Sequence, residues 1–270
     1  MKRLTFILAA VLTLSVTAHA FTTDTLSVDA TGYLPQDMTV AVITPDGPRP
    51  QSGFPSVYLL NGFGGDHKSW GIIRPDLGTL ADNMGLVLVM PSGMDTWYWD
   101  APADSTLRME SFITEVLVPY VDTNYPTDRR AENRAVTGLS MGGHGGLWLG
   151  LRHPDIWKSC GSTSGGVNIM PFPKNWKMSQ WLGPQEENAD TWKAHTVRNM
   201  VDRLVPGTSN IIFDCGSEDF FAEVNADLHT ALLEAGIPHD YISRPGKHNS
   251  AYWANALPYQ LMYFKSKFIE

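Results

Sequence analysis

Residues 134–143 read Arg-Ala-Val-Thr-Gly-Leu-Ser-Met-Gly-Gly, so that Ser140 stands between Gly138 and Gly142. The start of this stretch predicts a buried strand, and the residues from 143 to 151 predict a helix directly after it. A serine on a turn between strand and helix takes a strained backbone conformation that lifts its hydroxyl clear of the sheet. Side chains two residues away on either side would collide with neighbouring chain, so glycine is needed there. We therefore expect Ser140 to be a nucleophile, and not part of an incidental glycine-rich turn.

Apolar runs of about five residues alternate with amphipathic segments along the chain. Such runs are typical of strands that are covered on both faces. The expected strands are 38–43, 56–60, 86–90, 134–137, 210–213 and 240–243, with one more that carries Cys160. The expected helices are 74–84, 111–121, 143–151, 191–204, 222–235 and 252–268. This alternation predicts an α/β protein with a mostly parallel central sheet and helices on both faces, and the Ser140 turn makes it the α/β-hydrolase fold.

The first twenty residues have the three parts of a secretory signal peptide. Lys2 and Arg3 precede an apolar run over 4–16, and Ala18-His19-Ala20 fits a cleavage site. We therefore expect a cleaved leader over 1–20, a single catalytic domain over 21–270, and a secreted or periplasmic location. No other stretch is apolar for long enough to predict a membrane span.

Charge and composition narrow the possible partners. The net charge of -8 argues against a nucleic-acid surface, which needs clustered Lys and Arg. No metal-ligand motif or phosphate-binding loop is present, so neither a metal nor another cofactor is implied. Cys160 and Cys215 are expected on adjacent parallel strands, displaced by about four residues, or roughly 13 Å. That separation is too large for a disulfide and favours two buried thiols.

A serine hydroxyl needs a histidine base, and in this fold the acid and then the histidine follow the serine in the chain. Only His248 lies in a loop directly after the last expected strand; the other candidates after Ser140 are His144, His153, His195, His229 and His239. For the acid we favour Asp219, four residues past Cys215, with Asp214 and Glu218 as alternatives. The oxyanion donors are expected to be the N–H groups of Met141 and Phe63, with Gly62 as the rival to Phe63.

Several motifs resemble one known family of esterases. They are 59–65 with Ser69-Trp70, 90–92 with 97–100, 138–143, 215–220 and 246–248. This family contains S-formylglutathione hydrolases (esterase D), tributyrin esterases, feruloyl esterases and mycolyltransferases, and the nearest group is that of exported esterases from gut Bacteroidetes. The resemblance covers about 41–264, and its motifs match the catalytic residues and oxyanion donors expected above. Many members have histidine at the position of Asn61, so the acyl preference of this chain is left open.

The substrate site is expected to involve Asn61, Gly62, Trp70 and Tyr98, although aromatic residues are also ordinary core. Bulky side chains there predict a short acyl pocket. The segment 168–190 has three prolines, two tryptophans and little periodicity, which favours an ordered rim or small lid over a decorative insertion.

The expected activity is that of a secreted serine carboxylesterase acting on small or aromatic acyl esters, which include acetyl or feruloyl groups on polysaccharides. The partner is then a small-molecule or carbohydrate ester. The alternatives are an acyltransferase that uses the same triad and a non-catalytic carbohydrate-binding protein on a hydrolase scaffold.

Overall fold

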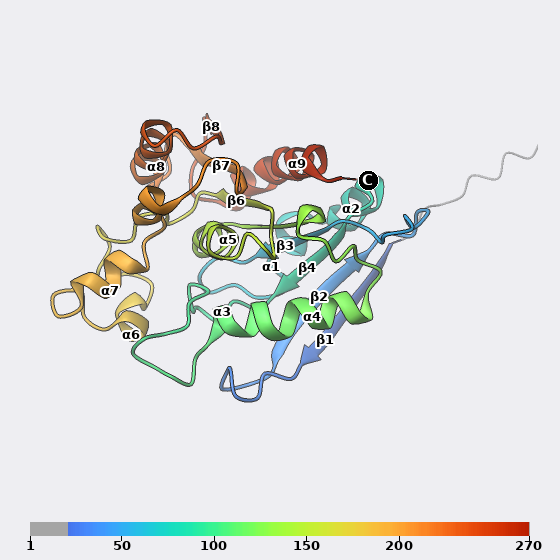
Figure 1. Ribbon diagram of the computed structural model, residues 1–270, viewed down its shortest axis with the longest axis horizontal. Helices are drawn as coiled ribbons and strands as arrows, with labels where there is room; N and C mark the ends of the chain where they lie inside the picture. Colours follow the sequence, from blue (N-terminus) through green and yellow to red (C-terminus); the bar gives the residue numbers. More distant parts are fainter. Residues whose placement is uncertain (1–20, 270) are drawn as a thin grey trace, which may run out of the picture.

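The computed structural model describes residues 21–269. The signal peptide expected over 1–20 lies outside these residues. Within them, one eight-stranded sheet has the order β1-β2-β4-β3-β5-β6-β7-β8 (Figure 1). The strands are β1 (Thr22–Val28), β2 (Met38–Thr44), β3 (Ser56–Leu60), β4 (Val87–Pro91), β5 (Arg134–Gly138), β6 (Ser159–Thr163), β7 (Asn210–Gly216) and β8 (Asp240–Arg244).

The sheet is parallel from β4 to β8, and β2 is antiparallel to both β1 and β4. This mostly parallel sheet with helices between its strands is the α/β-hydrolase architecture expected from the sequence. β1 was not expected from the sequence. It is a largely exposed edge strand, rich in threonine and without an apolar run, so the pattern of a buried strand does not apply to it.

Alternate residues of the strands point into two separate cores, one on each face of the sheet. In β3, Tyr58 and Leu60 belong to one core, whereas Val57 and Leu59 belong to the other. The larger core packs against α5 (Met141–Arg152), α8 (Ala222–Glu234) and the helical run over 109–124. The smaller core packs against α1 (Ser69–Ile73), α2 (Leu77–Met84) and α9 (Ser250–Lys267).

Three helices differ from expectation. The helix expected over 74–84 begins only at Leu77, because the chain turns at Pro75 after α1. The helix expected over 111–121 is a run of α3 (Met109–Phe112), a π-helical turn over Ile113–Leu117, and α4 (Val118–Asn124). The helix expected over 191–204 is divided into α7 (Ala189–Ala194) and a 3-10 helix over Val197–Arg203. Between these two, Thr196 is extended and its hydroxyl donates to the Trp192 carbonyl at 2.8 Å, which ends α7.

The segment 168–190 is mostly turns, as expected, but it also contains the short helix α6 (Met178–Leu182). It projects with α7 to one side of the sheet, at the left of Figure 1. Both cysteines are buried and unpaired, as the strand register predicts: Cys160 is opposite Ile211, four residues before Cys215. In the described part of the chain, no helix combines the length and apolar character that a bilayer crossing requires.

Candidate active site

Ser140 lies on a sharp turn between β5 and α5. Its φ of 56° and ψ of -116° are a strained conformation for a residue with a side chain. Only glycine fits at position 142 of this turn, because a Cβ there would lie 2.4 Å from the Leu60 carbonyl oxygen of β3. The Ser140 hydroxyl therefore stands at the carboxyl end of the sheet, where the loops after the parallel strands meet.

Three side chains expected to act together are in contact. His248 Nε2 lies 2.9 Å from Ser140 Oγ. On the other side of the ring, His248 Nδ1 lies 2.9 and 3.0 Å from the two carboxylate oxygens of Asp219. This order of serine, imidazole and carboxylate is the one that lets a base remove the serine proton while the acid fixes the ring.

The loops after β7 and β8 bring Asp219 and His248 together. They touch along their backbones: a Cβ on Gly216 would lie 2.3 Å from the Gly246 carbonyl oxygen, and the Glu218 N–H donates to that oxygen at 2.9 Å. Asp219 Oδ1 also accepts the Phe221 N–H at 2.8 Å, and Asp219 is only 6% exposed. The carboxylate is thus held in one orientation toward His248.

The two alternative acids lie elsewhere. Glu218 points toward solvent, with its carboxylate 3.6 Å from Lys247 Nζ. Asp214 is fully buried within β7 and accepts a hydrogen bond from the Gln260 amide at 2.6 Å. Burial raises the pKa of Asp214 to about 6. Neither carboxylate contacts His248, so the geometry favours Asp219.

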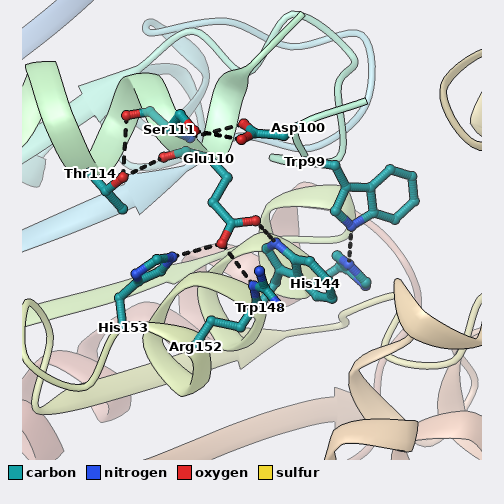
Figure 2. A network of polar contacts seen from close by, with 9 residues as sticks. All are labelled: Trp99, Asp100, Glu110, Ser111, Thr114, His144, Trp148, Arg152 and His153. Carbon is teal, nitrogen blue, oxygen red and sulfur yellow. Dashed lines mark hydrogen bonds and ion pairs between the residues drawn. The ribbon is translucent and has the colours of Figure 1, made fainter. Parts of the chain in front are cut away.

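His144, on α5, is buried among aromatic rings and has a structural environment (Figure 2). Its Nε2 accepts the Trp99 indole N–H at 2.9 Å, so its Nδ1 carries the hydrogen that is donated to the Gly166 carbonyl at 3.1 Å. Burial lowers the pKa of His144 to about 3. The Gly166 N–H in turn donates to the Ser140 carbonyl at 3.3 Å, which links this ring to the backbone of the nucleophile.

The Glu110 carboxylate accepts hydrogen bonds from two side chains of α5 and from His153, the residue directly after that helix (Figure 2). Trp148 Nε1 lies at 2.8 Å, and Arg152 Nε and His153 Nε2 both lie at 2.7 Å. Burial by itself would raise the pKa of Glu110, but the hydrogen bonds from His153 and Arg152 outweigh it and hold the pKa below its ordinary value. The charged carboxylate therefore fastens α5 to the start of α3.

The other histidines are also away from Ser140. His195 stacks on the Trp148 ring, and His229 Nδ1 lies 2.7 Å from His239 Nε2. Among residues 21–269, no group of three or more His, Cys, Asp or Glu side chains is arranged to hold a metal ion.

The two expected oxyanion donors flank the nucleophile. Met141 is the first residue of α5, where N–H groups have no partner within the helix. Phe63 lies in the turn after β3, which packs against the nucleophile turn: a Cβ on Gly62 would be 3.4 Å from Ser140 Cβ. Within the described residues, neither N–H donates to another protein group, whereas the adjacent Gly64 N–H donates to Asp95.

A cavity of about 470 Å³ opens at Ser140 and His248, and four aromatic side chains contribute to its walls. Phe220 lies with its ring centroid 4.2 Å from that of His248, and Trp176 stacks on Phe220 at 5.8 Å. The full set of lining residues is Gly62, Phe63, Gly64, Gly65, Ser69, Ile73, Leu139, Ser140, Trp176, Phe220, His248 and Trp253. Trp176 comes from the segment 168–190, which therefore forms part of the rim of this cavity.

Phe220 and Trp253 were not expected from the sequence. The available signal was proximity along the chain, because Phe220 directly follows Asp219 and Trp253 lies five residues after His248. Apart from Gly62, the residues expected to bind substrate do not line the cavity. Trp70 is 1% exposed and donates to the Leu60 carbonyl at 3.0 Å.

Asn61 and Tyr98 are buried as well. The Tyr98 hydroxyl lies 3.1 Å from the Asn61 carbonyl oxygen, and Asn61 Oδ1 accepts the Gly93 N–H at 2.8 Å. The structure thus places Asn61, Trp70 and Tyr98 beneath the cavity and not in its lining. Their polar groups bind the backbone beneath the site, which is what a buried donor or acceptor requires.

Comparison with known proteins agrees with this geometry. A family model described as "Putative esterase" matches residues 31–264. The diacylglycerol acyltransferase/mycolyltransferase Ag85B of Mycolicibacterium smegmatis is 29% identical over 250 residues, which cover 77% of this chain and 76% of that protein. The S-formylglutathione hydrolase of Mus musculus is 28% identical over 245 residues, covering 80% and 83%.

Among solved structures, a ferulic acid esterase superposes with a TM-score of 0.74 at 22% identity, and covers 93% of this chain and 99% of that one. The strand order, the strained serine between β5 and α5, and the family match along most of the chain lead to one conclusion. The chain belongs to this esterase family, a group of carboxylic-ester hydrolases with the α/β-hydrolase fold.

Proposed function

We propose that this protein is an exported serine carboxylesterase that cleaves small or aromatic acyl esters through an acyl-enzyme on Ser140. The observation that carries the proposal is the chain of contacts from Ser140 Oγ through His248 to Asp219, at 2.9 Å on each side of the ring, at the mouth of an aromatic cavity.

In the proposed reaction, His248 Nε2 takes the proton of Ser140 as Oγ attacks the ester carbonyl carbon. The carbonyl oxygen becomes an oxyanion, which the N–H groups of Phe63 and Met141 stabilise. The tetrahedral intermediate collapses, the C–O bond to the alcohol breaks, and His248 gives its proton to the leaving oxygen. Water then attacks the acyl-enzyme with His248 as the base, releasing the carboxylic acid and restoring Ser140.

The cavity supports the substrate class. Its walls of Phe63, Trp176, Phe220 and Trp253 offer flat apolar surfaces close to the nucleophile. Aromatic side chains pack well against planar rings, so an aromatic acyl group such as a feruloyl group, or a short acyl group such as acetyl, fits the space. Esters of this kind on polysaccharides are the substrates that we propose.

The decisive experiment compares the wild type with Ser140→Ala on p-nitrophenyl acetate, methyl ferulate and acetylated xylan. We expect the variant to lose on the order of 10⁴- to 10⁶-fold in kcat and to keep its fold by circular dichroism. A serine-reactive fluorophosphonate should label the wild type at Ser140 alone, as shown by peptide mass spectrometry. An alanine variant that retained a tenth or more of the wild-type rate would refute the assignment.

An acyltransferase is the second candidate, because a relative that is 29% identical carries an acyltransferase name. The same acyl-enzyme would pass its acyl group to an alcohol in place of water. Addition of glycerol during ester turnover separates the two activities: acylated glycerol as the main product would indicate transfer, and free acid would indicate hydrolysis.

Export is the remaining part of the proposal. It rests on the pattern of residues 1–20, with Lys2 and Arg3 before an apolar run and a small-residue cleavage site. Expression of the full chain in a Gram-negative host should give a periplasmic or secreted product whose intact mass begins at Phe21. A cytoplasmic product that retains Met1 would contradict it.

A further inference from the structure

The loop after β4 has a strained backbone and packs against the turn after β3, over residues 61–64, which carries Phe63 and is called the oxyanion turn below. Met94, Asp95, Trp97 and Tyr98 have φ values of 48°, 58°, 57° and 64°, in a region that side chains other than glycine rarely adopt. Strained residues of this kind persist only where surrounding contacts hold them, and they concentrate at functional sites. The contacts of this loop therefore indicate its role in the site.

The loop binds the turn after β3 at both of its ends. At the start of the turn, the Tyr98 hydroxyl lies 3.1 Å from the Asn61 carbonyl oxygen. At its end, Asp95 Oδ1 accepts the Gly64 N–H at 2.6 Å, which is short for a bond between an amide and a carboxylate. Gly62 and Phe63 lie between these two points, and Phe63 carries an N–H that is proposed to bind the oxyanion.

Asp95 also contacts the rim segment 168–190. Its Oδ2 lies 3.2 Å from Lys177 Nζ, and its backbone carbonyl accepts the Trp181 indole N–H at 2.8 Å. Lys177 Nζ in turn lies 5.5 Å from the centroid of the Phe63 ring. One aspartate thus joins the oxyanion turn to the rim of the substrate cavity.

We propose that Asp95 is a positioning residue that fixes the oxyanion donor of Phe63, an inference that rests on the proposed function above. The bond to Gly64 holds the peptide plane between Phe63 and Gly64. Gly64 has a φ of 75° and no side chain to restrict it, so this end of the turn can shift once the bond is lost. The Phe63 N–H lies in the preceding peptide and moves when the turn shifts as a whole. Such a shift would displace it from the place where negative charge develops, and preorganised donors lose most of their effect when they must reorient.

The test compares three variants by kcat, KM and the inhibition constant of phenylboronic acid, which adds reversibly to a serine oxygen as a tetrahedral adduct. Asp95→Ala removes both the acceptor for Gly64 and the ion pair. Asp95→Asn keeps an amide oxygen as acceptor but removes the charge. Lys177→Met removes the ion pair with Asp95 and the ammonium group near the Phe63 ring, but keeps the acceptor for Gly64. Asp104→Ala is the matched control, since among residues 21–269 the side chain of this aspartate hydrogen-bonds within its own loop, to Thr106.

We expect Asp95→Ala to lower kcat by about 10- to 100-fold, less than the loss of a whole oxyanion donor, and to weaken phenylboronic acid by a similar factor. KM should change by less than about threefold, because the donor acts mainly in the transition state. Asp95→Asn should restore kcat to within about fivefold of the wild type, and Lys177→Met and Asp104→Ala should stay within about threefold.

Two results would overturn the inference. One is an Asp95→Ala variant with wild-type kcat and boronate inhibition. The other is a loss of kcat in both Asp95→Asn and Lys177→Met that matches the loss in Asp95→Ala, which would assign the effect to the ion pair. If Asp95→Ala does not fold, a loss of more than about tenfold in kcat in both Asp95→Asn and Lys177→Met still overturns the inference. Failure of the proposed function would look different. The wild type itself would then show no ester turnover that depends on Ser140, whatever residue stands at position 95.

Discussion

At the scale of single residues, the carboxylate that faces His248 decides whether the imidazole can act as a base. Asp219 presents both oxygens to Nδ1, at 2.9 and 3.0 Å, and is almost fully buried. Asp219→Asn should lower kcat by about 10³- to 10⁴-fold, because an amide can hold the ring in the wrong tautomer. Glu218→Gln, one residue away and exposed, is the control and should stay within about twofold in the same p-nitrophenyl acetate assay. Equal losses in the two variants would contradict the assignment.

A second residue-scale prediction concerns stability in acid. The pKa of His144 is lowered to about 3 by burial, whereas a histidine in the unfolded chain titrates near about 6.5. Between these values the unfolded chain binds a proton that the native protein does not, so the free energy of unfolding falls as the pH falls. His144→Asn keeps a donor for the Gly166 carbonyl but does not titrate.

Urea unfolding at pH 7 and pH 5 measures this effect. The wild type should lose about 2 kcal/mol more than His144→Asn between these two values. Groups common to both proteins cancel in the comparison, so an identical pH dependence would show that His144 is not buried in its neutral form.

The sequence predicted these residues unevenly. Ser140, Asp219 and His248 were identifiable because each follows a strand at a position that the fold prescribes. Asn61 and Tyr98 were assigned to substrate because composition does not distinguish an aromatic or amide side chain that faces the cavity from one that faces the backbone below. Only packing decides that, and packing depends on residues distant in the chain, such as Gly93.

At the scale of elements, α5 carries the nucleophile and is anchored from behind by Glu110 (Figure 2). Glu110→Gln leaves Arg152 and His153 without their anionic partner and should lower the free energy of unfolding by about 2–4 kcal/mol. Glu234→Gln, at the exposed end of α8, should change it by less than about 0.5 kcal/mol. Denaturant unfolding followed by circular dichroism gives both values, and a Glu110 variant as stable as the control would refute the anchoring role.

Helices and strands were predictable where one hydrophobic pattern, either an apolar run or an amphipathic repeat, continued over the whole segment. The buried strands and α8 were found within one to three residues, because apolar runs and a helix ending near Gly236 are local signals. The division between α7 and the 3-10 helix was missed. It depends on the Thr196 hydroxyl, which donates a hydrogen bond to the Trp192 carbonyl. Such side-chain bonds to the backbone compete with a continuing helix, and the pattern of apolar residues does not reveal them.

At the scale of the whole molecule, aromatic side chains from separate parts of the chain line the active-site cavity. A methylene that reaches an apolar wall contributes about 0.8 kcal/mol, so an open groove would favour ever longer acyl chains. In a cavity of about 470 Å³ bounded by Trp176, Phe220 and Trp253, that gain should end after a few carbons. We expect kcat/KM to peak at acetyl to butyryl esters or at an aromatic acyl group, and to fall by octanoyl.

Phe220→Ala should shift this optimum toward longer chains, because Phe220 covers His248 and stacks on Trp176. Tyr259→Ala, an exposed aromatic on α9, is the control and should keep the wild-type profile. A series of p-nitrophenyl esters from acetyl to decanoyl measures both. Specificity constants that rise through decanoyl in the wild type would contradict the short cavity and leave the triad assignment intact.

The two buried cysteines can be used to measure how the core of the native protein opens. Neither is cross-linked, so the fold does not depend on an oxidant, and reductant can be present throughout purification. Burial raises the pKa of the Cys160 thiol to about 12, which leaves almost no reactive thiolate in the native protein. Cys160 and Cys215 are fully buried in the neighbouring strands β6 and β7, so a thiol-specific dye reaches them when this part of the sheet opens. The rate of labelling in the absence of denaturant therefore reports the population of the open form when reclosing is fast, and the rate of opening when the dye reacts faster than the core recloses.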